Sequence, residues 1–117
     1  MKSLVRVYRP TSDSQSRKAE EALLRHARYP LDDPTKYKQH RTVLGDGSDP
    51  LRFINTVVLD QAGLDAPNSA RSCIVMVNGL GAALGVFYQN MEPLSRMIPN
   101  SRVFAIDWLG TGRSGRP

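Results

Sequence analysis

Residues 73–85, CIVMVNGLGAALG, are the stretch that decides the fold. The first five are apolar without alternation, a pattern typical of a strand buried on both faces in a parallel sheet. A glycine-rich turn follows. Residues 102–106, RVFAI, predict a second buried strand, which we expect at an edge of the sheet. A strand, a turn, a helix and a strand in this order form a βαβ unit.

The helix of this unit is expected over residues 86–97, because four large apolar side chains recur there at helical spacing: Phe87, Met91, Leu94 and Met97. Pro99 and Asn100 follow and would end it.

Two strands and a helix are expected upstream. Residues 51–59 are rich in β-branched and aromatic residues, and residues 40–44 offer a shorter strand, so the two would form a hairpin. Ser12 and Gln15 fit a capping box, which predicts a helix from there to about residue 28. We expect its apolar face to pack on the sheet: Ala19, Ala22, Leu23 and Ala27.

The net charge of +5 belongs to one third of the 117 residues. Residues 1–41 carry ten basic and five acidic side chains, whereas residues 42–117 carry six of each. The basic segment suits a solvated helix or an anionic lipid surface. Nucleic acid is not the expected partner. The N-terminus lacks the apolar segment of a secretory signal, and the basic, Ser/Thr-containing residues 1–17 are compatible with a mitochondrial presequence.

The two glycine loops allow two functional interpretations. Gly79, Gly81 and Gly85 follow the first buried strand, and Asp107 ends the next, as in a dinucleotide-binding site for NAD. The second loop, residues 107–114, reads D-x-x-G-x-G-x-S, and a dinucleotide-binding domain has no need of it. In an α/β-hydrolase, such a loop follows the corresponding strand, and the first loop becomes the turn that stabilises an oxyanion.

Residues 74–90, IVMVNGLGAALGVFYQN, and 102–117, RVFAIDWLGTGRSGRP, resemble one branch of the α/β-hydrolase superfamily. This branch includes the comparative-gene-identification lipid-droplet protein, related N-acyl-phospholipid lipases and the fungal cardiolipin-specific deacylase. Residues 52–56, RFINT, are similar to the strand that precedes the core in these proteins. The resemblance implies acyl esters of phospholipids or glycerolipids as substrates, a membrane surface as partner, and no cofactor or metal.

Site roles follow from this resemblance. The position of Leu80 usually donates a backbone N–H to the oxyanion, and Gly79 and Gly81 shape that turn. Asn78 stands where the family usually has a His that orients the turn. The remaining matched positions form a structural loop: Asp107, Gly110, Gly112 and Ser114.

The chain holds no G-x-S-x-G nucleophile elbow, and His26 and His40 precede the core. We therefore expect the N-terminal portion of a larger serine-type hydrolase, inactive alone. The alternative is a non-catalytic, lipid-associated protein that recruits a lipase, and the NAD-binding module is a third hypothesis. Residues 1–50 are interpreted as a basic extension and residues 51–117 as the start of the hydrolase domain. The expected location is intracellular, at a mitochondrion, lipid droplet or membrane.

Overall fold

The computed structural model describes residues 11–67 and 71–117. The basic residues of the presequence-like stretch before residue 11 lie outside this description. In chain order the elements are α1 (Asp13–His26), β1 (Tyr37–Val43), β2 (Phe53–Leu59), β3 (Ser72–Val77), the short 3₁₀ helix η1 (Leu84–Phe87), α2 (Met91–Met97) and β4 (Ser101–Ile106). The predicted α/β class, with an open sheet of four strands and two α-helices, is confirmed.

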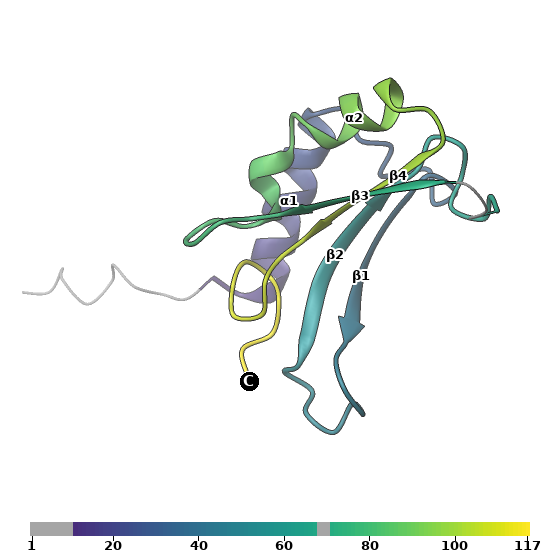
Figure 1. Cartoon of the computed structure of the whole chain (residues 1–117). Helices are drawn as coiled ribbons and strands as arrows, with labels where there is room; N and C mark the ends of the chain where they lie inside the picture. The colour runs from purple at the N-terminus through teal and green to yellow at the C-terminus, as the bar shows by residue number, and fades with distance from the viewer. Residues whose placement is uncertain (1–10, 68–70) are drawn as a thin grey trace, which may run out of the picture.

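The four strands form one mixed sheet in the order β1-β2-β4-β3 (Figure 1). The predicted hairpin is the antiparallel pair β1–β2, and the predicted βαβ unit is the parallel pair β3–β4. The expectation that the last strand lies at an edge is wrong. Strand β4 is internal, because it also pairs with β2 from Thr56↔Ile106 to Leu59↔Val103.

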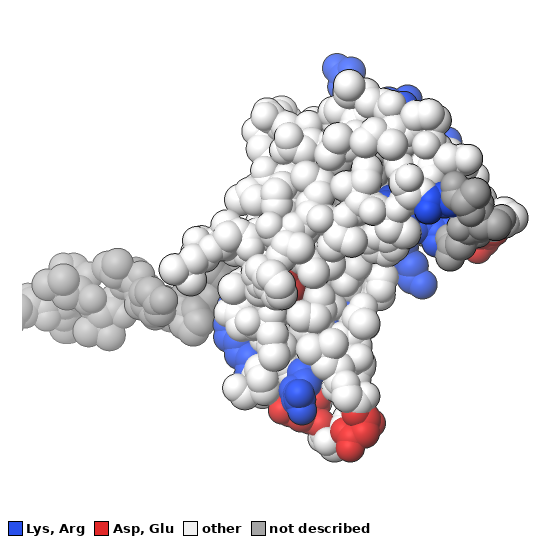
Figure 2. All heavy atoms as spheres, in the orientation of Figure 1, with Lys and Arg blue, Asp and Glu red and all other residues white. Residues whose placement is uncertain are grey.

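Strand β3 lies at one edge of the sheet. The prediction that it is buried on both faces is wrong. Cys73 is exposed rather than a core residue, and Val75 is 56% exposed. The strand has a neighbour on one side only, and the residues that alternate with the inward-facing Ile74 and Met76 lack a covering layer. Figure 2 shows few charged side chains over β3 and α2 on the face turned to the viewer.

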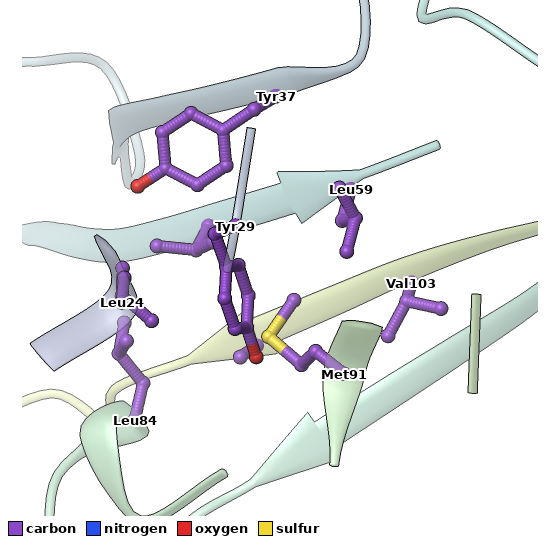
Figure 3. Close-up of a cluster of buried hydrophobic side chains, with 9 residues drawn as sticks. Leu24, Tyr29, Tyr37, Leu59, Leu84, Met91 and Val103 are labelled. Carbon is purple, nitrogen blue, oxygen red and sulfur yellow. The ribbon is translucent and has the colours of Figure 1, made fainter. Parts of the chain in front are cut away.

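The hydrophobic core lies between the sheet and the helices (Figure 3). Alternate residues of β2 and β4 supply its floor, with Val57, Leu59, Val103 and Ala105 fully buried. Its other members come from the helices and the connections: Leu24, Tyr29, Tyr37, Leu84 and Met91. Burial alternates along β4, as one-sided coverage of a sheet requires, whereas the last five residues of β2, 55–59, are all buried.

Helix α1 begins with the predicted capping box. The Gln15 N–H donates to Ser12 Oγ (3.2 Å), and the Ser12 N–H donates to Gln15 Oε1 (3.0 Å). Its predicted apolar face is wrong in part: Ala19 and Ala22 are exposed, whereas Leu23 and Ala27 are half-buried and Ala27 packs against the core. The buried face carries Glu20 and Leu24 instead.

The predicted helix over residues 86–97 divides into η1 and α2, which begins only at Met91. Pro93 explains the break, because its ring excludes the helical carbonyl four residues earlier and is tolerated only in a first turn. The helix is therefore short, and Met97, predicted to face inward, is 77% exposed.

Residues 1–50 were predicted to form an extension, and that division stays a prediction. In the described structure, β1 belongs to the same sheet as the later strands, and α1 and β1 both contribute side chains to the core. No helix among the described residues combines the length and apolar character needed to cross a bilayer.

A buried ion cluster ties together the end of β2 and the starts of β3 and β4. Asp60 is fully buried and accepts two bonds from Arg71, at 2.5 and 2.7 Å, and one from Arg102 Nε at 3.0 Å. Burial opposes ionisation of Asp60, but the two guanidinium groups outweigh it and hold the pKa of the carboxyl below its usual value. A lowered pKa means that this contribution to stability is present at neutral pH and is lost as the pH falls through the folded-state pKa.

We predict that Asp60→Asn lowers the free energy of unfolding by about 3 kcal/mol, because Arg71 and Arg102 would remain buried without a countercharge. Urea denaturation followed by circular dichroism measures this change. The matched control is Asp32→Asn, which removes the exposed pair with Arg25 (Asp32 side chain 83% exposed) and should change the free energy of unfolding far less, because water screens an exposed ion pair. Equal losses in the two variants would show that burial does not matter here.

Candidate active site

Two loops meet beyond the ends of the parallel strands β3 and β4. The first, residues 78–83, connects β3 to η1, and the second, residues 107–115, follows β4. Because Val77 and Ile106 are in register, both loops leave the sheet at the same level. The carboxyl ends of parallel strands are where α/β folds place their sites.

The Asp107 carboxylate joins these loops to each other and to the sheet. It is fully buried. Oδ1 accepts the Leu84 N–H at 2.6 Å, while Oδ2 accepts Asn55 Nδ2 at 2.9 Å and the Arg113 N–H at 3.0 Å. Three segments far apart in the sequence therefore depend on one side chain.

Strand β2 holds the second loop through two further buried polar groups. The Asn55 N–H donates to Ser114 Oγ (2.8 Å), and this hydroxyl donates to the Asp107 carbonyl (2.7 Å). The Gly115 N–H donates to the Phe53 carbonyl at 3.0 Å. Ser114 is 2% exposed, so its hydroxyl is occupied in holding the loop and is not available to a substrate.

Two glycines of the second loop meet different constraints. Gly112 has φ +49°, and a Cβ there would overlap the carboxylate of Asp107. Gly110 has φ +85°, a left-handed conformation that side chains disfavour, but it faces open space. Gly112 is thus required by packing as well as by conformation.

Asn78 organises the first loop from within. It is 2% exposed, and its Nδ2 donates to the carbonyls of Gly79 (3.1 Å) and Ala82 (2.8 Å) and lies 3.4 Å from Thr111 Oγ1. The loop closes with the Ala82 N–H on the Gly79 carbonyl, at 3.2 Å. The Asn78 amide thus makes the contacts that fix the turn, and its contact with Thr111 links the first loop to the second.

The backbone N–H groups of Gly79, Leu80 and Gly81 have no acceptor within the described part of the chain. Gly81 has φ +75° and the Leu80 side chain is completely exposed, so the tip of the turn projects from the body. Successive unpaired N–H groups in such a turn suit an anion. The role of Leu80 as an oxyanion donor stays a prediction.

No nucleophile and base come together at this turn among the residues the structure describes. Ser114 is buried, His40 belongs to β1, and His26 ends α1. The same described residues contain no group of three side chains suited to hold a metal ion.

The dinucleotide interpretation requires a carboxylate that is free to bind ribose hydroxyls. Asp107, at the predicted position, is fully buried, and both of its oxygens already accept hydrogen bonds. The Asp107 carboxylate is therefore not available to accept a hydrogen bond from a ribose hydroxyl.

Asn55, Glu20 and Arg113 help to build the site and were not predicted from the sequence. Arg113 reaches from the second loop to Glu20 of α1, with Nη1 and Oε1 at 3.1 Å. Burial raises the pKa of Glu20, although Arg113 opposes the shift. The one sequence signal was Asn55, a polar residue within the otherwise apolar start of β2.

Curated proteins similar to this chain are named as acyltransferases. A protein of Oryza sativa subsp. japonica named "Probable 1-acylglycerol-3-phosphate O-acyltransferase" is 46% identical over 70 residues, which are 60% of this chain and 15% of that protein. The "1-acylglycerol-3-phosphate O-acyltransferase" of Arabidopsis thaliana is 38% identical over 95 residues, covering 71% of this chain and 21% of the relative. The "1-acylglycerol-3-phosphate O-acyltransferase ABHD5" of Rattus norvegicus is 32% identical over 107 residues, covering 92% and 25%.

The chain thus spans at most a quarter of the length of these relatives. No family model matches it, and no solved structure matches it. The relatives support the placement in the α/β-hydrolase superfamily that the two loop motifs predict, and a broad link to lipid acyl chemistry.

We predict that Gly112→Ala destabilises the chain by about 3 kcal/mol, because overlap with the Asp107 carboxylate adds to the strain of a positive φ. Gly110→Ala is the matched control and should cost about 1 kcal/mol, the conformational part alone. Thermal unfolding of both variants measures the difference. If Gly110→Ala costs as much as Gly112→Ala, the packing of Gly112 on Asp107 is not what constrains this position.

Proposed function

We propose that this chain carries the oxyanion-stabilising turn of a serine-type α/β-hydrolase-like enzyme that transfers or hydrolyses acyl groups of glycerophospholipids. The observation that carries the proposal is the row of three unpaired backbone N–H groups at Gly79, Leu80 and Gly81. The printed names of the relatives, 1-acylglycerol-3-phosphate O-acyltransferases, support acyl transfer as the reaction class.

Attack on an ester or thioester carbonyl places a negative charge on its oxygen. Backbone N–H groups that are already fixed stabilise this charge without reorganising during the reaction. Here the fixing comes from Asn78 inside the turn and from the Asp107–Leu84 bond directly behind it. In this mechanism Leu80 contributes its backbone N–H, and its side chain is free to contact the substrate.

Exposed apolar side chains surround the turn and favour a lipid as substrate. Leu80 lies at its tip, Val86 (53% exposed) follows in η1, and Trp108 (54%) and Leu109 (38%) begin the second loop. Contiguous exposed apolar surface on soluble domains marks interaction with lipid or protein. In the proposal, these four apolar side chains receive the acyl chain at a membrane or lipid-droplet surface.

The nucleophile and the general base do not come from the described residues, since Ser114 is buried and both histidines lie elsewhere. We therefore propose that these groups belong to chain beyond this part, as in a protein of the relatives' length, and that the 117 residues alone do not catalyse acyl transfer. The branch with the lipid-droplet protein and the deacylase is the family that we propose for it.

A chimera tests this proposal. The segment of the Arabidopsis relative that matches this chain is replaced by residues of this chain, and acyl transfer to a 1-acylglycerol-3-phosphate is measured. We predict an active chimera in which Leu80→Pro lowers kcat by about 10²–10³-fold, the loss that follows removal of one oxyanion donor.

Leu80→Ala is the matched control for the N–H, because it keeps that group; its kcat should stay within about threefold, while the lost side-chain contact with the acyl chain raises KM. A soluble, folded chimera that is inactive with the unaltered segment, or one in which Leu80→Pro leaves kcat unchanged, would overturn the proposal. A folded but inactive chimera would also favour the lipase-recruiting alternative.

A further inference from the structure

Five residues form a closed ring of polar contacts that joins the second loop to α1, β1 and β2. Asn55 Nδ2 donates to Asp107 Oδ2 at 2.9 Å, and Gln39 Nε2 lies 3.4 Å from Asn55 Oδ1. Gln39 Nε2 also donates to Glu20 Oε1, which accepts a second bond from Arg113 Nη1 at 3.1 Å. The Arg113 backbone N–H closes the ring on Asp107 Oδ2 at 3.0 Å.

Glu20 is the member of the ring that α1 supplies. Among the 14 residues of this helix, Glu20 and Leu24 are the buried ones. The Glu20 side chain is 7% exposed and the Arg113 side chain 9%, so this ion pair lies away from water. Replacing a buried ion pair by well-packed apolar residues is often neutral or stabilising. Packing of α1 alone therefore does not explain a carboxylate at this position.

The Glu20 carboxylate is the buried countercharge of Arg113. The guanidinium also lies 3.4 Å from Asp13, but the Asp13 side chain is 60% exposed, so water screens that contact. Burial raises the pKa of Glu20, whereas the bonds from Arg113 and Gln39 act in the opposite direction and favour the charged form. The charge on Glu20 thus depends on Arg113, and the buried position of Arg113 depends on Glu20.

Arg113 is held at both ends, by Asp107 at its backbone and by Glu20 at its guanidinium. On the far side of the carboxylate, Asp107 Oδ1 accepts the N–H of Leu84 at 2.6 Å. Leu84 is the first residue after the first loop and begins η1. A change at Glu20 can therefore reach the first loop through three successive contacts between buried groups. Contiguous networks of this kind carry coupling between separate parts of a protein.

We propose that Glu20 is a positioning residue for the turn at residues 78–83. Its carboxylate holds the Arg113 guanidinium, and Arg113 and Asp107 then hold the point at which the turn joins η1. Glu20 touches no substrate in this role. The consequence for catalysis rests on the proposed function, whereas the effect on the turn does not. Helix α1 then supports the site, although it lies far before the first loop in the sequence.

Amide hydrogen exchange on the ¹⁵N-labelled full chain tests the effect on the turn. Glu20→Gln keeps the size of the side chain and removes its charge. We expect exchange at the Leu84 amide to become about tenfold faster, or more, relative to the amides of the β2–β4 ladder. The difference arises because the Asp107 contacts open more often while the sheet stays intact.

Glu21→Gln is the matched control. Glu21 is the next residue of α1, but its side chain is 42% exposed and lies 3.7 Å from the exposed Arg17. Its substitution removes the same charge from the same helix without touching the ring. Exchange at the Leu84 amide should then change by less than about twofold.

A second variant keeps the test decisive if Glu20→Gln does not fold. Arg113→Gln breaks the same contact from the other side, and Glu20, whose pKa is already raised by burial, can then take up a proton. We expect a similar increase at the Leu84 amide. The double variant should speed exchange no more than either single change, because both changes remove one and the same contact.

Enzyme kinetics test the consequence for catalysis. The relative of Rattus norvegicus matches 92% of this chain, a span that includes α1, so its matching segment can be replaced by residues of this chain. In such a chimera we expect Glu20→Gln to lower kcat about tenfold and to leave KM within about twofold, because the N–H groups of the turn act on the transition state. Glu21→Gln should change neither. A residue that only stabilises the fold would leave kcat unchanged at a temperature where the variant is fully folded.

Three results separate the possible failures. Exchange at Leu84 that changes equally in Glu20→Gln and Glu21→Gln, or no more than in the β2–β4 ladder, would overturn the proposal. An active chimera in which Glu20→Gln leaves kcat unchanged would overturn it as well. A folded chimera that is inactive with the unaltered segment would contradict the proposed function alone, and the exchange at Leu84 would then decide whether Glu20 positions the turn.

Discussion

The buried carboxylate of Asp107 is the contact on which both loops depend. Its oxygens accept the Leu84 N–H from the first connection, the Arg113 N–H from the second, and the Asn55 side chain from β2. A buried carboxylate needs such donors, because an unpaired charge in the interior is very costly. The position of the turn at residues 78–83 relative to the sheet follows from this one set of bonds.

The pattern D-x-x-G-x-G-x-S acquires a physical reason from this contact. Gly112 is small because Asp107 lies against it, and Ser114 joins the Asp107 carbonyl to the Asn55 N–H. These residues support the candidate site without touching a substrate. The unpaired N–H groups of the first loop, which carry the functional proposal, are fixed by neighbours that are themselves buried and hydrogen-bonded.

Local patterns in the sequence predicted the strands, the hairpin, the βαβ unit and the capping box, because each depends on residues close together in the chain. The long-range features were missed. No local sequence pattern indicates that β4 lies between β2 and β3. For this reason the prediction that β3 is buried on both faces is wrong. Glu20 faces inward because Arg113, 93 residues away, pairs with it, and this pairing turns Ala19 outward. The loop residues were found through a motif, whereas the roles of Asn55 and Arg113 depend on their tertiary contacts with Asp107 and Glu20.

Amide hydrogen exchange on the unaltered chain tests most directly whether Asp107 makes the two loops and the sheet one unit. The account predicts that the amides of Leu84 and Arg113 exchange with the same free energy of opening as the neighbouring Asn55 amide in β2, since all three open only when the Asp107 contacts break. Amides of Leu84 and Arg113 that exchange at the rate of ordinary exposed loops, while Asn55 stays protected, would contradict it.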